Sequence, residues 1–540
     1  MTALVLGPLL RHVSERSATV WVETDAPCEV RVLSRERGVD AAARTFTLHG
    51  HHYALVDVDN LEPGTTVPYE VTLDGETVWP EPRSTYPPSV IRTMAREPET
   101  LKIAFGSCRR SPDKANRHGL DALSAYGHVM ASGGERPDVL LMVGDQVYAD
   151  ELSDEMRAFI AQRRKPGQEP YDELAEFEDY TYLYRLAWRE DPAVRWLLST
   201  VPTYTVFDDH DIRDDWNTSY AWRQQMEATP WWRDRIIGGI GSYWIYQHLG
   251  NLSPEERAAD LVYKAVLAAS ENGGDGGEIL DEFADRADRD PASARWSYKH
   301  DWGGTRLIVV DSRCSRLLTS ERRGMLDDEE FRWLDEQCQG DRDHLLIASS
   351  LPYLLPRTIH NAENWNEAMA EGAWGQKGAW IAERMRQAAD LEHWAAFNAS
   401  FRLVAEDVLA VARGERGAAP ASISFLSGDV HYSYLARVTS PDTRSTISQV
   451  VCSPFRNQLH GTIRWANKVA AVPGTAWAFR LLARLARVAP PPLRWRVTEG
   501  PWFDNAIATV QLSGRECRVR WRTPRTETEL SELRDVQLTG

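Results

Sequence analysis

Residues 203–217, TYTVFDDHDIRDDWN, change within a few positions from an apolar run to five aspartates and one histidine. Carboxylates about 6 Å apart at an effective dielectric constant near 20 repel each other by roughly 3 kcal/mol per pair. A solvated acidic loop would disperse this charge in water. A bound cation would instead neutralise this charge, because carboxylate and imidazole are ligands for hard and borderline metal ions.

Three further segments place similar side chains directly after apolar runs. FGSCRR contains Cys108, MVGDQVYAD contains Asp145 and Tyr148, and LSGDVHYSY contains Asp429 and His431. A turn would explain any one of them alone. Because each set follows a separate buried strand, the fold could bring all of them to one edge, and together they favour a metal site over coincidental turn chemistry.

The elements that must position these side chains alternate between two patterns from Leu101 onward. LKIAFGSC, DVLLMVGD, VPTYTVF, TRLIVVDS, HLLIASS and SISFLSGD are short, nearly continuous apolar runs, and most are separated by segments of helical pattern. Buried strands that alternate with helices indicate an α/β layered fold. Sites in such folds form at the carboxyl ends of strands. We expect this catalytic domain to span residues 100–522.

Residues 1–95 show a different, all-β pattern. SATVWVET, HHYALVDVDNL and VPYEVTLDG alternate apolar and polar residues with period two. NLEPGTTVPYEV resembles a fibronectin type III or immunoglobulin-like sandwich, with Tyr69 as its corner tyrosine. We therefore expect a separate N-terminal β-sandwich domain, and we expect residues 523–540 to form a polar, solvated tail.

Residues 462–489 predict two amphipathic helices broken at Pro473-Gly474. Their basic, apolar face could touch a membrane or another subunit, but the favoured interpretation is packing on the core.

The composition excludes several classes of protein. Hydrophobic residues make up 43% of 540 residues, with 21 tryptophans, so the chain is not disordered. The formal net charge of −17 gives no global field that attracts nucleic acid or an anionic membrane. The six cysteines are scattered and form neither a disulfide framework nor a structural zinc site. With no secretion signal or membrane-span pattern, we expect a cytoplasmic protein.

The order GSC, GDxxY, VPTYxxxDDHD and GDVH resembles the alkaline phosphatase D (PhoD-like) family, within the calcineurin-like metallophosphoesterases. The resemblance covers nearly the whole chain, including the β-sandwich ahead of the catalytic domain. It implies a layered sandwich of two mixed sheets flanked by helices. It also implies a metal-dependent phosphoric ester hydrolase, active on phosphomonoesters, phosphodiesters or both, whose substrate is a small phosphate ester.

The same resemblance implies a ligand set. Asp145 would bridge two metals, and Cys108, Tyr148 and His431 would complete an iron(III) site. Asp209 and Asp429 would belong to a neighbouring site for calcium or another divalent ion such as manganese, zinc or magnesium. The first motif departs from common calcineurin-like enzymes, because it has GSC instead of an aspartate and a histidine. Tyr148 stands where an aspartate is usual, and both departures match the PhoD-like subgroup.

The implied mechanism uses two cations to lower the pKa of a bridging water, whose hydroxide attacks phosphorus. His210 would then donate a proton to the leaving alkoxide. Its sequence neighbours Asp208 and Asp211 would orient the imidazole and raise its pKa. Arg213 would contact the phosphate, since guanidinium matches phosphate bidentately. Roles for some further residues remain open as ligands, supports or pocket lining: Asp208, Asp214, Asp215, Asn217 and His360.

Two alternatives belong to other classes. One is a metal-dependent hydrolase of another ester class. The other is a non-catalytic binding protein with a decayed hydrolase domain, against which the intact candidate residues argue: Asp145, Asp209, His210, Asp429 and His431. No nucleic-acid binding is expected beyond a phosphodiester substrate.

Overall fold

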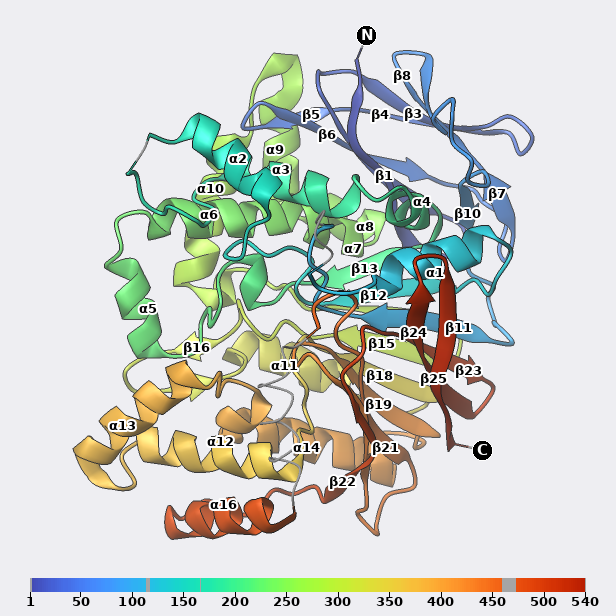
Figure 1. Ribbon diagram of the computed structural model, residues 1–540. Coiled ribbons are helices and arrows are strands. Elements are labelled where there is room, and N and C mark those ends of the chain that lie inside the picture. The colour runs from blue at the N-terminus through green and yellow to red at the C-terminus, as the bar shows by residue number, and fades with distance from the viewer. Residues whose placement is uncertain (1, 113–116, 166, 459–472, 540) are drawn as a thin grey trace.

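The computed structural model describes residues 2–112, 117–165, 167–458 and 473–539. Its chain forms an N-terminal pair of sheets, a layer of helices, and two larger sheets that pack face to face (Figure 1).

The N-terminal strands form two four-stranded antiparallel sheets with an apolar core between them. The first sheet has the order β1 (Leu4–Val13), β2 (Ala18–Thr24), β6 (His51–Val58) and β5 (Phe46–Leu48). The second has the order β4 (Val39–Arg44), β3 (Glu29–Ser34), β8 (Glu70–Leu73) and β9 (Glu76–Trp79). A separate pair, β7 (Thr66–Pro68) and β10 (Val90–Arg92), closes one end. This is the expected all-β N-terminal region.

Tyr69 corrects one detail of that expectation. A corner tyrosine bonds to backbone a few residues upstream within its own sandwich. Here the Tyr69 hydroxyl donates to the carbonyl of Ser199, at 2.6 Å, in helix α4 (Pro192–Thr200). The buried hydroxyl thus joins the sandwich to the following region.

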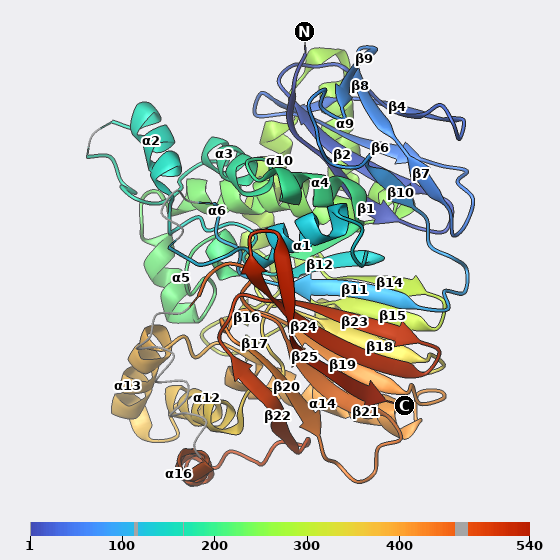
Figure 2. The same ribbon diagram turned by 45° about the vertical axis from the view of Figure 1, so that its right-hand side comes forward.

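Two mixed sheets form the centre of the rest of the chain. One has the order β13 (Thr203–Val206), β12 (Val139–Val143), β11 (Leu101–Gly106), β23 (Ile507–Ser513), β24 (Glu516–Thr526) and β25 (Glu529–Thr539). The other has the order β14 (Tyr298–Trp302), β15 (Thr305–Val309), β18 (His344–Ala348), β19 (Ser422–Ser427), β21 (Thr446–Val451), β20 (Ser433–Val438) and β22 (Trp495–Trp502). Figure 2 shows β23 between β11 and β24. The predicted layered α/β fold is confirmed.

The continuous apolar runs are explained by burial on both faces of each sheet. In β12, Val139, Leu141 and Val143 face the core between the two sheets, whereas Leu140 and Met142 face the helical layer. Strands covered on both sides lose the period-two pattern because no position faces water.

Helices cover the outer faces of these sheets. The first layer contains α1 (Ala122–Ala131), α2 (Asp154–Arg163), α3 (Phe177–Trp188), α4, α5 (Tyr220–Glu227), α6 (Trp232–Ser242), a π-helix (Tyr243–His248), α7 (Leu249–Asn251), α8 (Pro254–Ala259), α9 (Leu261–Ser270) and α10 (Gly277–Arg289). The second contains α11 (Asp328–Gln337), α12 (Arg357–Ala370), α13 (Gly375–Ala388), α14 (Asn398–Arg413) and α16 (Pro473–Leu485). No helix among the described residues is both long and apolar enough to cross a bilayer.

The N-terminal sandwich shares a core with the first helical layer. Trp21 and Tyr53 pack against Tyr246 of the π-helix, with ring centroids 5.3 and 5.7 Å away. The Trp21 indole also donates to the carbonyl of Ile245 at 3.0 Å. The two regions are therefore joined by buried apolar surface.

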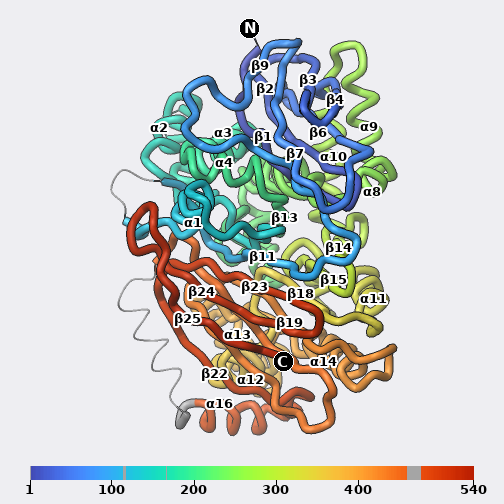
Figure 3. Tube along the Cα trace, turned by 90° about the vertical axis from the view of Figure 1, so that its right-hand side faces the viewer, coloured from blue at the N-terminus to red at the C-terminus, as the bar shows by residue number. Residues whose placement is uncertain are grey.

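The expected polar tail is wrong for the residues described. Residues 529–539 form β25, which pairs antiparallel with β24 at the edge of the six-stranded sheet (Figure 3). Leu538 is buried in the core that also contains Trp521. The segment looks polar because an edge strand with one face in water carries charged residues on that face.

Of the two amphipathic helices predicted for residues 462–489, the second is α16, which begins at Pro473. The first falls on residues 459–472, outside the described part of the chain.

Candidate metal centre

The four predicted segments meet at one edge of the two sheets. Strands β11, β12 and β13 are parallel, so their carboxyl ends lie side by side. The backbone amide of Cys108 donates to the carbonyl of Gly144 at 3.2 Å, which ties the first two loops together. The loop after β19 arrives from the opposite sheet, where the Asp429 amide donates to the Ser107 hydroxyl at 3.1 Å.

The backbone is strained at four residues that carry these side chains. Cys108, Asp145, Asp429 and His431 have φ between 51° and 65°, in the left-handed region that non-glycine residues rarely adopt. Such conformations cost of order 1–3 kcal/mol each and persist where the surroundings enforce them. Gly144 allows the close packing, because a Cβ there would lie 2.9 Å from the Cβ atoms of Asp208 and Ser350.

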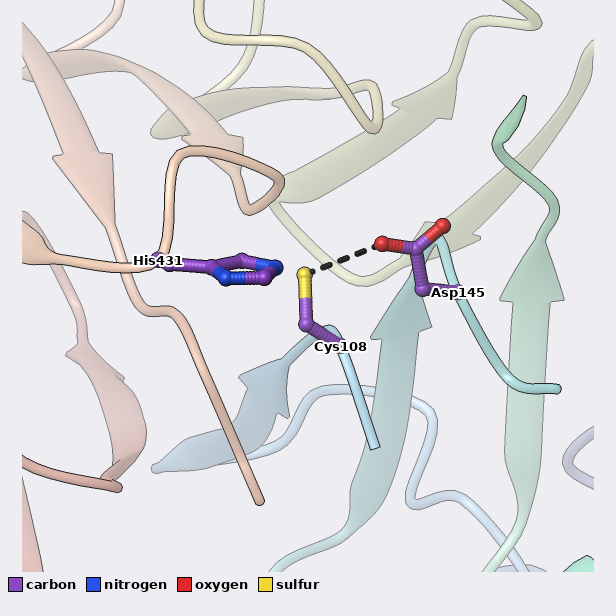
Figure 4. A group of neighbouring side chains, drawn as sticks. All are labelled: Cys108, Asp145 and His431. Atoms are coloured by element: carbon purple, nitrogen blue, oxygen red, sulfur yellow. Dashed lines mark hydrogen bonds between the residues drawn. The ribbon is translucent and has the colours of Figure 1, made fainter. Parts of the chain in front are cut away.

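The first group of possible metal ligands consists of Cys108, Asp145 and His431. Their ligand atoms all lie within 4.8 Å of one another, and the Cys108 Sγ is 3.2 Å from Asp145 Oδ2. Figure 4 shows the imidazole and the carboxylate approaching the sulfur from two sides. Burial raises the pKa of the Cys108 thiol and of the Asp145 carboxyl well above their usual ranges. Burial also lowers the pKa of His431 to about 4, which leaves its ring neutral and able to ligate.

Tyr148 points toward the same group. Its hydroxyl lies 3.4 Å from Asp145 Oδ2 and accepts a hydrogen bond from Asn457 at 3.0 Å. The sulfur of Cys108 has two hydroxyl neighbours, from Ser107 at 3.1 Å and Ser453 at 3.3 Å. Sequence reasoning missed Ser453 and Asn457, although CSPFRN follows the apolar end of β21 as the other site segments follow their strands.

A second group adjoins the first through Asp145. Oxygens of Asp145, Asp208 and Asp209 lie within 4.8 Å of one another. Asp145 Oδ1 and Asp208 Oδ2 are buried and have no hydrogen-bond partner among the described residues. Buried carboxylate oxygens without partners are costly unless a cation offsets them. Asp208 is therefore a possible metal ligand.

The carboxylate of Asp429 faces a histidine that sequence reasoning missed. Its Oδ2 lies 2.9 Å from His393 Nε2, and His393 Nδ1 lies 2.7 Å from Glu363 Oε1. The carbonyl oxygen of Asp429 is 3.6 Å from the Cys108 sulfur. His393 follows a segment of helical pattern, so no strand-end signal pointed to it.

Arg313 holds the second group together. Its fully buried guanidinium contacts both oxygens of Glu392 at 2.6 and 2.8 Å. It also donates to Asp208 through Nε and lies 3.1 Å from Asp209 Oδ1 through Nη2. Its fixed positive charge offsets the buried carboxylates, which would be costly without a counter-charge. Its position in VVDSR, after an apolar strand, is a signal that could have found it.

His210 is oriented by Asp150, which corrects the expected role of Asp208 and Asp211. Its Nδ1 lies 3.0 and 3.1 Å from the two oxygens of Asp150. Asp211 instead accepts from the backbone amides of Asp208 and Val147, at 2.8 and 3.2 Å. The reason is the 3₁₀ turn at Asp209–Asp211, which sends successive side chains in different directions.

Electrostatics favour a protonated His210. Burial lowers its pKa, but the carboxylates of Asp150 and Asp209 more than offset this, so the pKa lies well above its usual value. The side chain is 15% exposed, and Nε2 lies 3.7 Å from an oxygen of Asp214. The Tyr148 ring packs 4.6 Å from the imidazole and limits its motion.

Two predicted residues lie apart from the ligand groups. Arg213 pairs with Glu173 at 3.4 Å and lies over Trp231, so its expected contact with phosphate has no support in the described contacts. His360 is fully buried between the rings of Phe401 and Trp495 and does not line the site.

The other residues whose roles the sequence left open are Asp214, Asp215 and Asn217, in the loop that follows β13. The Asn217 amide donates to the carbonyl of Arg313 at 3.1 Å. The Asp215 backbone amide donates to Asp209 at 3.0 Å, and both Asp215 and Asn217 have left-handed backbone. Asp214 belongs with Asp209 and His210 to a third group of possible ligands within 4.8 Å.

A cavity of about 320 Å³ opens beside these residues. Tyr148, Asp150 and Arg110 line it, and the Arg110 guanidinium lies 4.5 Å above the Tyr148 ring. Arg110 pairs with Glu151, which also lines the cavity, so a phosphate ester entering here would meet charges of both signs.

Comparison with known families agrees with this geometry. Residues 103–266 match the family model described as PhoD-like phosphatase, a range that includes Cys108, Asp145, Tyr148, Asp209 and His210. The chain carries a PhoD-like phosphatase domain. The expected resemblance is therefore confirmed over this range, and it indicates a phosphoesterase. Residues 1–91 match a second family model, described as a domain of unknown function, DUF7800.

Solved structures show the PhoD-like fold over nearly the whole chain. A structure titled "Structure of PhoD" is 13% identical with a TM-score of 0.60, covering 99% of this chain and 90% of that one. The purple acid phosphatase PPD1 from yellow lupin seeds is 10% identical with a TM-score of 0.50, covering 98% and 74%. The comparison with curated proteins gives no match.

Proposed function

We propose that this PhoD-like chain hydrolyses phosphoric esters, as a phosphomonoesterase, a phosphodiesterase or both, in a metal-dependent reaction with His210 as proton donor. The observation that carries the proposal is that a group of possible metal ligands lies beside a possible proton donor. Tyr148 links the Cys108–Asp145–His431 group to the His210–Asp150 pair, with its hydroxyl 3.4 Å from Asp145 Oδ2 and its ring 4.6 Å from the imidazole, and Tyr148 and Asp150 both line one cavity.

The donor atoms fit two different cations. Cys108, Tyr148, Asp145 and His431 offer sulfur, phenol oxygen, carboxylate and nitrogen, a set that suits iron(III), because a trivalent ion stabilises anionic thiolate and phenolate. Asp145, Asp208 and Asp209 offer only carboxylate oxygens, which suit calcium or another divalent ion such as manganese, zinc or magnesium. Asp429 lies near both sets, because its carbonyl oxygen is 3.6 Å from the Cys108 sulfur and, in addition to burial, its carboxylate raises the pKa of Asp208. Bound metals would activate water for attack on phosphorus and stabilise the charge that develops on the phosphoryl oxygens.

The protein's own contribution is to hold a proton at a defined atom. With Nδ1 bonded to Asp150, the imidazolium keeps its Nε2 proton, 3.7 Å from an oxygen of Asp214, for donation to a leaving alkoxide. Asp150 stabilises the charged ring, and Tyr148 fixes its plane. Arg110 pairs with Glu151 as Arg213 pairs with Glu173, but Arg110 lines the cavity, and for that reason we propose it as the phosphate contact.

The test compares p-nitrophenyl phosphate with bis(p-nitrophenyl) phosphate, before and after chelation and with elemental analysis of the same samples. We expect p-nitrophenol release that disappears when the metals are removed and returns on their addition. Asp145→Asn should abolish it, whereas Asp172→Asn, at a side chain 77% exposed, should not. Unchanged turnover in protein shown to be metal-free would contradict the proposal. Activity confined to p-nitrophenyl acetate would support a different ester class.

A further inference from the structure

Exposed large apolar side chains are concentrated on two neighbouring helices. Seven of the twelve such side chains among the described residues lie on α13, its N-terminal cap and α16: Trp374, Trp380, Ile381, Met385, Trp477, Leu481 and Leu485. A concentrated apolar patch on a protein surface marks an interaction site more often than scattered exposed residues do.

On α16 the apolar residues share one face with arginines. Trp477, Leu481 and Leu485 follow one another at intervals of four and are 68%, 42% and 62% exposed. Arg480 and Arg484 are also exposed and lie on the same side of the helix. We call these five residues the Trp-Arg face.

The opposite face of α16 accounts for its packing on the protein. Ala483 and Ala486 are buried, and the Phe479 ring lies 6.0 Å from Trp365 of α12. The helix therefore already packs on the core through this face, as the favoured interpretation of the sequence predicted. The Trp-Arg face is additional apolar surface that packing within the described chain does not use.

Helix α13, which like α16 packs against α12, carries a second group of exposed apolar residues. Trp365 also lies 5.8 Å from Trp374, so one α12 side chain contacts both α16 and the N-terminal cap of α13. Trp380 is 62% exposed, and the Arg384 guanidinium lies 4.9 Å from its ring centroid. Tryptophan beside arginine thus recurs on the second helix.

The charge of this region is opposite to that of the whole chain. Residues 473–498 contain five arginines and no aspartate or glutamate, in a chain whose formal net charge is −17. Arg480, Arg484 and Arg487 are exposed. The region would attract an anionic surface that the rest of the protein repels.

We propose that the Trp-Arg face, with the exposed residues of α13, docks on an anionic lipid surface. Tryptophan and leucine would enter the boundary between headgroups and acyl chains, and the arginines would pair with lipid phosphates. The helix would lie in the plane of the membrane without crossing it. A second copy of the chain fits less well, since a two-fold contact would place arginines against the same arginines of its partner.

The test measures co-sedimentation of the full-length protein with vesicles. One set contains equal parts of phosphatidylglycerol and phosphatidylcholine, and the other contains phosphatidylcholine alone. We expect binding to the anionic set, weakened by salt, and little binding to the neutral set. Near an anionic surface each arginine contributes about fivefold to binding, so Arg480→Glu/Arg484→Glu should lower the partition coefficient by about 25-fold or more. Trp477→Ala/Leu481→Ser should also weaken it.

Matched controls lie on other surfaces. Leu261→Ser, at a side chain 78% exposed on α9, and Arg332→Glu/Arg525→Glu, at exposed positions, should bind like the wild type. All variants should keep wild-type hydrolysis of a soluble phosphate ester, which shows that they fold. Equal binding by the Arg480→Glu/Arg484→Glu variant and the control, or no wild-type binding to anionic vesicles, would overturn the proposal. So would a dimer, detected by light scattering, that Trp477→Ala/Leu481→Ser dissociates.

Discussion

His210 Nδ1 lies 3.0 Å from an oxygen of Asp150, a residue 60 positions earlier in the chain. The two residues come from loops that follow different strands, β12 and β13, and they meet because those strands are parallel neighbours. The pair gives the proposed proton donor a fixed ring orientation and a hydrogen-bonded carboxylate, whereas Asp209, adjacent to His210 in sequence, contributes only its charge.

Replacing His210 with alanine should lower turnover by about 10²–10⁴-fold on alkyl phosphates, because general acid catalysis contributes that range. The loss should be smaller on p-nitrophenyl phosphate, whose leaving group needs no proton. Asp150→Asn should show an intermediate loss, with Asp172→Asn, at a side chain 77% exposed, as its control. Steady-state kinetics on both substrates check this. Wild-type turnover of His210→Ala on an alkyl phosphate would rule out the role.

Replacing Arg313 with methionine should destabilise the fold by about 3–5 kcal/mol, because it removes the counter-charge of buried Asp208 and Asp209 and leaves Glu392 with Arg316 alone. Arg313→Lys should recover only part of this, since an ammonium cannot make the bidentate contact with Glu392. Urea unfolding measures the difference, with Arg332→Met on the surface as control. A variant as stable as the wild type would mean that the network contributes no net stability.

Replacing Glu363 with glutamine should weaken the affinity for the divalent ion by about 10–100-fold, the usual effect of disturbing a residue that orients a ligand. The physical reason is the Glu363–His393–Asp429 chain of contacts, which fixes the Asp429 carboxylate. Titration of metal-depleted protein followed by elemental analysis checks this. Glu371→Gln, exposed at the end of the same helix, should have no effect. Equal affinities in both variants would show that the chain does not position Asp429.

The purified native protein should be coloured if Cys108 and Tyr148 ligate iron(III), because thiolate and phenolate donors give charge-transfer absorption in the visible. Tyr148→Phe should shift or abolish the band, whereas His210→Ala and the exposed control Tyr171→Phe should leave it nearly unchanged. Absorption spectroscopy with iron analysis decides. A band that survives both Tyr148→Phe and Cys108→Ser would exclude both residues as ligands.

Stability should fall as the pH rises from about 6.5 to about 9, through His51 of the N-terminal sandwich. Burial lowers its pKa, but hydrogen bonds to Glu178 of α3 and to Glu23 raise it to about 9. Protonated His51 therefore contributes fully below about pH 6.5, and up to about 3 kcal/mol is lost as the pH passes the folded-state pKa. Urea unfolding at both pH values should show this loss in the wild type and in His52→Gln. An equal loss in His51→Gln would assign it to other groups.

The sequence alone determined the elements and the residue types at their ends. Apolar runs such as DVLLMVGD predicted strands buried on both faces, and the order of GSC, GDxxY, DDHD and GDVH predicted the family, because these patterns are local. Where parallel strands end side by side, residues such as Cys108 and Asp145 are brought to one edge by the topology itself.

Only the tertiary structure decided which side chains meet. Asp150 rather than Asp208 reaches His210, and Arg313 and His393 enter from distant segments, because loop dihedral angles and long-range packing set those contacts. Arg213 lies inside the most specific motif yet points to Glu173. Residues 529–539 form an edge strand rather than a tail, since their charged composition reflects one solvated face and the pairing partner lies in β24. The spacing of residues in the sequence does not determine the direction of their side chains across such loops. These contacts therefore follow only from the tertiary structure.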